Sequence, residues 1–207
     1  MAFPGQLVQV MADVLGVSKA TAVQYDRMLA ENGLRSKHGR GTSAAKVNSE
    51  DAANLLITLA ASASLGETPN NAVHVCKKFG SFVSVPLDDW PASCSKLGLS
   101  FVAELPPVHS FKTALAALIK SAAAGQLSVS SDLSAWVQFV APEPGVHIVC
   151  TSDKIGVEAR QHYVDISPAA VRRVKRRGLF HGDLVTMSTV GLPTLRALGA
   201  LVADADH

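Results

Sequence analysis

The stretch covering residues 15–42, LGVSKATAVQYDRMLAENGLRSKHGRGT, decides how the first part of this chain folds. Just upstream, apolar residues within residues 7–15 recur every three or four positions, a pattern typical of a short amphipathic helix. Gly16 can end that helix in a left-handed conformation, and Ser18 stands where an N-cap belongs. A second helix is therefore predicted over residues 19–32, and two helices separated by so short a turn form a helix-turn-helix.

Polar and basic side chains gather at the start of the second helix and in the loop that follows it. Hydroxyl groups and a helix N-terminus can bind phosphate, lysine can reach phosphate or guanine, and glutamine can make a bidentate contact with adenine. Between residues 32 and 49 there are four basic residues and no acidic one, which is the local charge that DNA binding needs. The candidate DNA-binding residues are Ser18, Lys19, Thr21, Gln24, Arg35, Lys37, Arg40, Thr42 and Lys46.

At these residues the sequence resembles the reading head of winged helix-turn-helix regulators of the GntR type. The wing is one residue shorter than in that pattern, and the helix start at residues 48–51 is similar to the MerR-like heads. The resemblance covers about 30 of the 207 residues and implies a recognition helix in the major groove and a wing at the minor groove or backbone. The matching residues are Leu15-Gly16-Val17-Ser18, Thr21, Leu29, Gly33-Leu34 and Gly39-Arg40-Gly41-Thr42.

A break in composition divides the chain after the next helix. Ser49 is predicted to cap a helix that runs to about Ser64, and residues 66–71 (GETPNN) then read as a linker. We therefore predict a winged helix-turn-helix domain over residues 1–66 and a second domain over residues 72–207. Because a reading head with its own core can fold alone, the first segment is expected to fold and bind DNA weakly in isolation.

The second part of the chain is predicted to be α+β with an antiparallel sheet. A helix is expected over residues 111–124, and strands over 136–141, 146–151 and 155–164 are joined by connections short enough for hairpins. A basic helix, a further strand and a terminal helix are predicted over residues 168–177, 184–190 and 194–202. The role of the basic run Arg172–Arg177 stays open between a solvated helix face, a phosphate contact and a patch for an acidic partner.

Composition excludes several other classes of protein. Nineteen basic and seventeen acidic residues give a net charge of only +2, and the three cysteines are too far apart for a CxxC pair. The start of the chain lacks the features of a secretory signal, and no run of about 18 apolar residues indicates a membrane span. A cytoplasmic protein without a membrane partner is expected.

Motifs for catalysis are absent, so neither an enzyme nor a bound cofactor or metal is predicted. His147 and His162 lie on neighbouring predicted strands and could form a metal site with Cys150, but a packed or solvent-facing pair is the preferred interpretation. Glu158 and Arg160 are interpreted as cross-strand pairing partners rather than acid–base machinery.

These observations lead to two hypotheses about function. The first is a sequence-specific, DNA-binding transcription regulator of bacterial or phage type that acts as a homodimer on double-stranded DNA. Its C-terminal domain would supply dimerisation or a surface for a small-molecule or protein effector. The alternative is a phage DNA-packaging or genome-maintenance factor, such as a DNA-recognition subunit resembling a small terminase. A neighbouring gene for a large terminase would favour packaging, and a divergent promoter would favour regulation.

Overall fold

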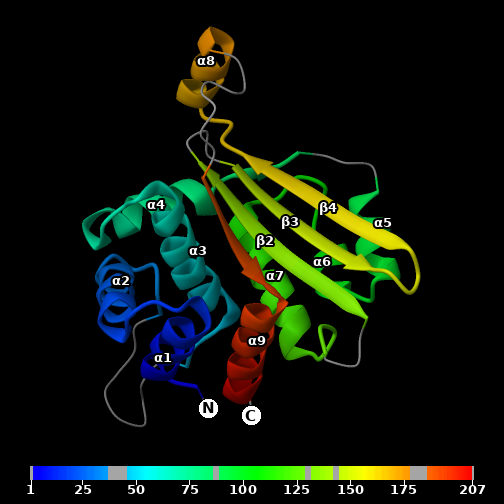
Figure 1. Cartoon of the computed structure of the whole chain (residues 1–207), viewed down its shortest axis with the longest axis horizontal. Helices are drawn as coiled ribbons and strands as arrows, with labels where there is room; N and C mark the ends of the chain where they lie inside the picture. The colour runs from blue at the N-terminus through cyan, green and yellow to red at the C-terminus, as the bar shows by residue number, and fades with distance from the viewer. Residues whose placement is uncertain are drawn as a thin grey trace.

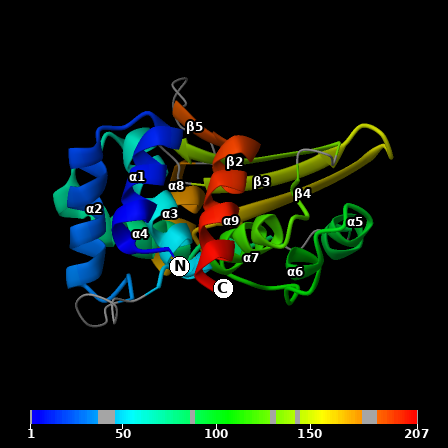
Figure 2. The same cartoon turned by 90° about the horizontal axis from the view of Figure 1, so that it is seen from below.

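A computed structural model describes residues 2–36, 46–85, 89–128, 132–141, 145–177 and 186–206 (Figure 1). Within these ranges the chain has an α+β fold, which confirms the predicted class. A five-stranded antiparallel sheet has helices packed on one face, and no helix that the structure describes covers its other face (Figure 2). No helix in the described ranges is long and apolar enough to cross a membrane.

Three helices open the chain, and the second and third begin at residues whose side chains cap them. They are α1 (Pro4–Leu15), α2 (Lys19–Glu31) and α3 (Ser49–Leu65), which confirm the three predicted helices. The predicted cap of α3 is wrong by one residue, because Asn48 and not Ser49 is the N-cap. The Asn48 side chain accepts from the Asp51 amide at 2.8 Å, and the Asp51 carboxylate accepts from the Asn48 amide at 3.3 Å. This reciprocal capping box places Ser49 inside the helix.

The middle of the chain is mostly helical, and two of its short helices were not predicted from the sequence. The helix over residues 111–124 is confirmed as α7, but α5 and α6 were not predicted, because seven and four residues are too few to show a helical period. The elements in order are η2 (Pro69–Asn71), α4 (Ala72–Gly80), β1 (Val83–Ser84), α5 (Trp90–Lys96), α6 (Ser100–Ala103) and α7 (Phe111–Ala123).

The sheet confirms the predicted strands and hairpin order. Its strand order is β1-β4-β3-β2-β5, with every neighbouring pair antiparallel. The terminal helix begins two residues earlier than predicted, because a proline is accommodated in the first turn of a helix. The elements are β2 (Leu133–Ala141), β3 (Gly145–Ser152), β4 (Val157–Val164), α8 (Pro168–Arg177), β5 (Thr186–Gly191) and α9 (Leu192–Asp206).

The apolar core lies between the sheet and the helices and continues into the N-terminal helices. Phe139 on β2 meets Phe79 of α4 and Phe111 of α7, with ring centroids 6.0 and 5.6 Å apart. Helix α3 packs against α4, α7 and β5, and α1 packs against α9. Buried side chains from both sides of residues 66–71 therefore belong to one cluster. The division into two domains stays a prediction.

Candidate nucleic-acid interface

Three residues form the turn between α1 and α2. Gly16 ends α1 with φ of 65°, a left-handed conformation that glycine adopts without strain. The amide of Val17 donates to the Ala12 carbonyl at 3.2 Å, which closes the turn. The hydroxyl of Ser18 then accepts from the Thr21 amide at 3.0 Å, so the predicted N-cap of α2 is confirmed.

The first turns of α2 present polar side chains to solvent. Ser18, Lys19 and Gln24 are exposed, and Thr21 is half-buried. The hydroxyls of Ser18 and Thr21 lie 2.8 Å apart and share one hydrogen bond. Neither Lys19 nor Gln24 has a hydrogen-bond or ion-pair partner within the described ranges. Their side chains are therefore available to an external partner without first breaking an internal contact.

Arg27 extends the same exposed side of α2 and was missed by the sequence analysis. It lies three residues after Gln24, a spacing that places the two on one side of a helix. Its Nε atom is 2.7 Å from Glu31, and both side chains are largely exposed. Such a surface pair contributes little to stability, so the guanidinium can exchange Glu31 for a phosphate at small cost. Extending the helical period beyond Gln24 would have found this residue.

Arg35 is placed differently from the other predicted site residues. Its Nε atom lies 2.8 Å from Asp26 on α2, and the two side chains are only 16% and 11% exposed. Burial raises the pKa of Asp26 to about 6, the charge of Arg35 opposes this rise, and nearby Asp51 adds to it. Arg35 therefore holds the segment after α2 against the body of that helix, an internal role that the sequence did not predict.

The predicted wing falls largely on residues that the structure does not describe. Lys37, Arg40 and Thr42 lie outside the described residues, whereas Lys46 is described and exposed. The two ends that flank this stretch are both tied to Asp51 at the start of α3. Its carboxylate accepts from the amide of Ser36 at 2.8 Å and from the amide of Asn48 at 3.3 Å. The described residues on the two sides of this stretch therefore meet at the carboxylate of Asp51.

Helix α8 is the second basic element. Residues 172–177 contain five basic residues and no acidic one. Its first turn is held by Ser167, whose amide donates to Asp165 at 2.8 Å and whose hydroxyl accepts from the Ala170 amide at 3.3 Å. The helix extends away from the body of the molecule (Figure 1), and Arg172 is exposed. This placement leaves α8 accessible to a large partner.

The structure separates the histidine pair on the sheet from Cys150. His147 and His162 are directly opposite on β3 and β4, with ring centroids 4.3 Å apart. Cys150 is buried on the opposite face, because residues three apart on a strand point to opposite sides. No group of three His, Cys, Asp or Glu side chains gathers among the described residues. The preferred interpretation of a packed pair therefore agrees with the geometry.

The pairing of Glu158 with Arg160 differs from the prediction. Both residues lie on β4, two positions apart, and the Arg160 Nη2 atom is 3.0 Å from Glu158 Oε1. The contact thus runs along one strand and not across two. Alternate residues of a strand share a face, so two long side chains can meet without a partner on the neighbouring strand.

Comparison with known proteins identifies no relative of this chain. No protein-family model matches it, no curated protein matches it, and no solved structure matches it. A function for this chain therefore has to be argued from its own residues.

Proposed function

We propose that this chain is a sequence-specific DNA-binding transcription regulator whose helix α2 enters the major groove. The observation that carries the proposal is the exposed side of α2, where Lys19 and Gln24 have no internal partner and follow a tight turn from α1. Lysine and glutamine are among the side chains that read guanine and adenine edges. At about 10–12 Å in diameter with its side chains, a helix fits the major groove.

The charges around α2 support DNA as the partner. Arg27 extends the exposed side, and Lys46 stands at the exit of the basic loop, next to the helix that anchors it. Lys37 and Arg40 belong to that loop and would contact the backbone or minor groove in this proposal. The overall charge of +2 is small, so any attraction to phosphate comes from local clusters of basic residues and not from the chain as a whole.

A homodimer is part of the proposal. One helix-turn-helix contacts a single half-site, and regulators reach useful affinity by placing two recognition helices about one helical turn of DNA apart. Two copies related by a two-fold axis would read a palindrome, since the symmetry of the site mirrors that of the protein. The C-terminal part of the chain, with its sheet, would supply the contact between copies.

Selection of bound duplexes from random DNA with the purified full chain tests this function. We expect recovery of a palindromic sequence, and its affinity is then measured by fluorescence anisotropy for matched and scrambled duplexes. Gln24→Ala should change which bases are preferred, at about 1–3 kcal/mol for a lost bidentate contact. Gln9→Ala on α1 is the matched control, since Gln9 is engaged by Asp13 at 2.8 Å and lies outside the proposed interface.

Two results would contradict this function. The first is a selection that recovers no preferred sequence. The second is Gln24→Ala and Lys19→Ala variants that are folded by circular dichroism and bind every duplex as tightly as the unchanged chain.

A further inference from the structure

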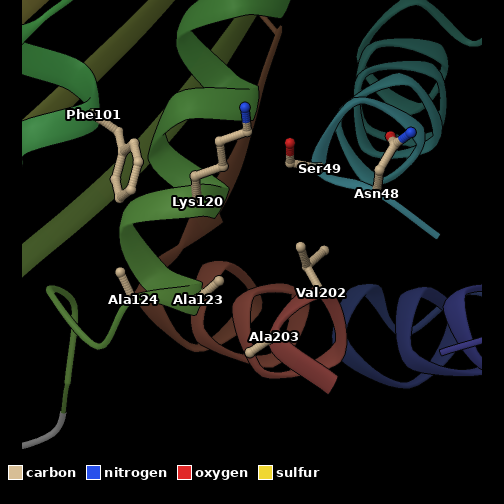
Figure 3. A pocket seen from close by; sticks show the side chains of 8 residues that line it. All are labelled: Asn48, Ser49, Phe101, Lys120, Ala123, Ala124, Val202 and Ala203. Carbon is tan, nitrogen blue, oxygen red and sulfur yellow. The ribbon is translucent and has the colours of Figure 1, made fainter. Parts of the chain in front are cut away.

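A cleft of about 430 Å³ opens where three helices converge (Figure 3). It lies between the N-terminus of α3, the end of α7 and the last turns of α9. Its walls therefore come both from the N-terminal helices and from the later part of the chain. Its volume is in the range of small-molecule sites, which measure about 300–1,000 Å³. The lining residues are Asn48, Ser49, Phe101, Lys120, Ala123, Ala124, Val202 and Ala203.

The α3 side of the cleft offers hydrogen-bond donors. The capping box satisfies the amide of Asp51, but the amides of Ser49 and Glu50 have no acceptor within the described ranges. The first amides of a helix point outward along its axis and favour anions. Ser49 is only 3% exposed, and its hydroxyl has no hydrogen-bond partner among the described residues. Figure 3 shows this hydroxyl directed into the opening.

Lys120 adds a positive charge that has no ion-pair partner among the side chains that the structure describes. Its ammonium reaches over the cleft from α7 on the side of Ser49 (Figure 3), and no carboxylate of the described residues pairs with it. The nearby carboxylate of Glu50 is instead 3.4 Å from the ammonium of Lys112. Asp51 is bonded within the α3 cap. The cleft thus combines the ammonium of Lys120 with the positive end of a seventeen-residue helix.

The end of α7 on the other side of the cleft has most of its carbonyls engaged within the chain. The carbonyls of residues 120–122 accept hydrogen bonds from the amides of Ala124, Gly125 and Gln126. The hydrogen-bond donors of the cleft are therefore concentrated on the α3 side, where the free amides and the ammonium of Lys120 favour an anion.

The remaining wall of the cleft is apolar. Phe101 is 40% exposed at its edge, and alanine and valine side chains from α7 and α9 form its floor. We infer that this cleft binds a small organic anion, a carboxylate or a phosphate carried on an apolar group. The anion meets Ser49 and Lys120, and the apolar group covers Phe101. This inference goes beyond the proposed function and does not depend on DNA binding.

Binding of simple probes to the full chain tests the inference. Benzoate and phenyl phosphate are titrated while backbone amide resonances are followed by NMR, with benzyl alcohol as the neutral analogue. We expect saturable shifts centred on Ser49, Glu50 and Lys120 with at least one anion, and the stronger of the two identifies the anionic group. Lys120→Gln should raise the Kd about tenfold, since a charge-assisted hydrogen bond is lost.

Controls separate binding at this cleft from general attraction to a basic chain. Lys96→Gln removes an exposed lysine of α5 that does not line the cleft, and it should leave the Kd unchanged. Ala203→Leu fills the floor and should abolish the shifts at Ser49. The inference is overturned if neither anion gives saturable shifts, if benzyl alcohol binds as well as benzoate, or if Lys120→Gln leaves the Kd unchanged. None of these results bears on DNA binding.

Discussion

At the scale of single residues, the ion pair between Asp26 and Arg35 shows how the loop after α2 is held. Burial raises the pKa of Asp26, and the guanidinium 2.8 Å away lowers it again only in part. The resulting pKa is about 6. Because the folded pKa lies above the unfolded value of 3.8, the folded state binds the proton more tightly. This group therefore contributes stability below about pH 4 that is lost as the pH rises towards 6.

Arg35→Gln should lower the free energy of unfolding by about 3 kcal/mol at pH 7.5, since it leaves a buried carboxylate without its cation. The loss should be smaller at pH 5, because Asp26 can then take up a proton and become neutral. Urea denaturation at the two pH values measures both quantities. Arg27→Gln breaks an exposed pair and should cost less than about 1 kcal/mol at either pH. If Arg35→Gln lowers the free energy of unfolding equally at both pH values, Arg35 does not act by compensating the charge of Asp26.

The histidine pair predicts a second pH effect of opposite sign. Burial lowers the pKa of His147 below 6.5, and the charges of His162 and Arg160 lower it further. For a base with a depressed folded pKa, stability is present above pH 6.5 and is lost as the pH falls through the folded pKa. His162→Gln should therefore shift the pKa of His147 upward, towards 6.5, which an NMR titration of the ring protons measures. An unchanged or lower pKa of His147 would show that the charge of His162 does not contribute to its depression.

At the scale of elements, the close packing of α7 against α9 depends on one glycine. A β-carbon built on Gly199 would lie 2.5 Å from the β-carbon of Ala122 and 2.7 Å from the Ala123 backbone nitrogen. Gly199→Ala should therefore destabilise the chain by about 1–3 kcal/mol, because the two helices must separate. Gly5→Ala in α1 meets open space and should be neutral or slightly stabilising. Thermal unfolding of both variants provides the comparison, and equal melting temperatures would rule out the close approach.

Helix α8 yields a prediction that rests on the proposed function. A ten-residue helix with five like charges gains little from its own propensity, and it makes only slight contact with other elements. A polyanion would relieve the repulsion between these charges. Replacing Arg172 and Arg173 with Gln should flatten the log–log salt dependence of DNA affinity by up to about two units. The preferred sequence should stay the same, and an unchanged slope would show that α8 does not contact the duplex.

The elements with strong local signals are also those that the sequence predicted. Ser18 and Gly16 define the turn before α2, and short connections define the hairpins of the sheet. The inward contact of Arg35 could not be predicted, because its partner Asp26 is identified only when α2 and the loop are packed together. The cleft at Lys120 was missed for the same reason, since its walls come from helices far apart in sequence.

At the scale of the whole molecule, α3 is the element that links the two parts of the chain. Fourteen of its seventeen residues are buried, and most elements against which it packs lie after residue 66. In the sequence, the apolar residues Ala52, Leu55, Leu56 and Leu59 recur at helical spacing and indicate only one buried face for this helix. A helix buried on nearly all sides occupies the centre of a fold, and here it supports the capping box that holds the basic loop.

A fragment of residues 1–65 tests whether the N-terminal helices are independent. The sequence predicts that this fragment folds, whereas the packing of α3 predicts that it does not. Leu55, Leu56 and Ile57 are fully buried, and exposing each such side chain costs about 1.5–3 kcal/mol. Exposing three or four such side chains would cost most of the roughly 5–15 kcal/mol by which a typical domain is stable. On heating, we expect the circular dichroism signal of the fragment to show no cooperative transition, because the fragment is not folded. The full chain should unfold cooperatively. A cooperative transition in the fragment would instead support a separate N-terminal domain, and α3 would then have to cover its apolar sides by self-association.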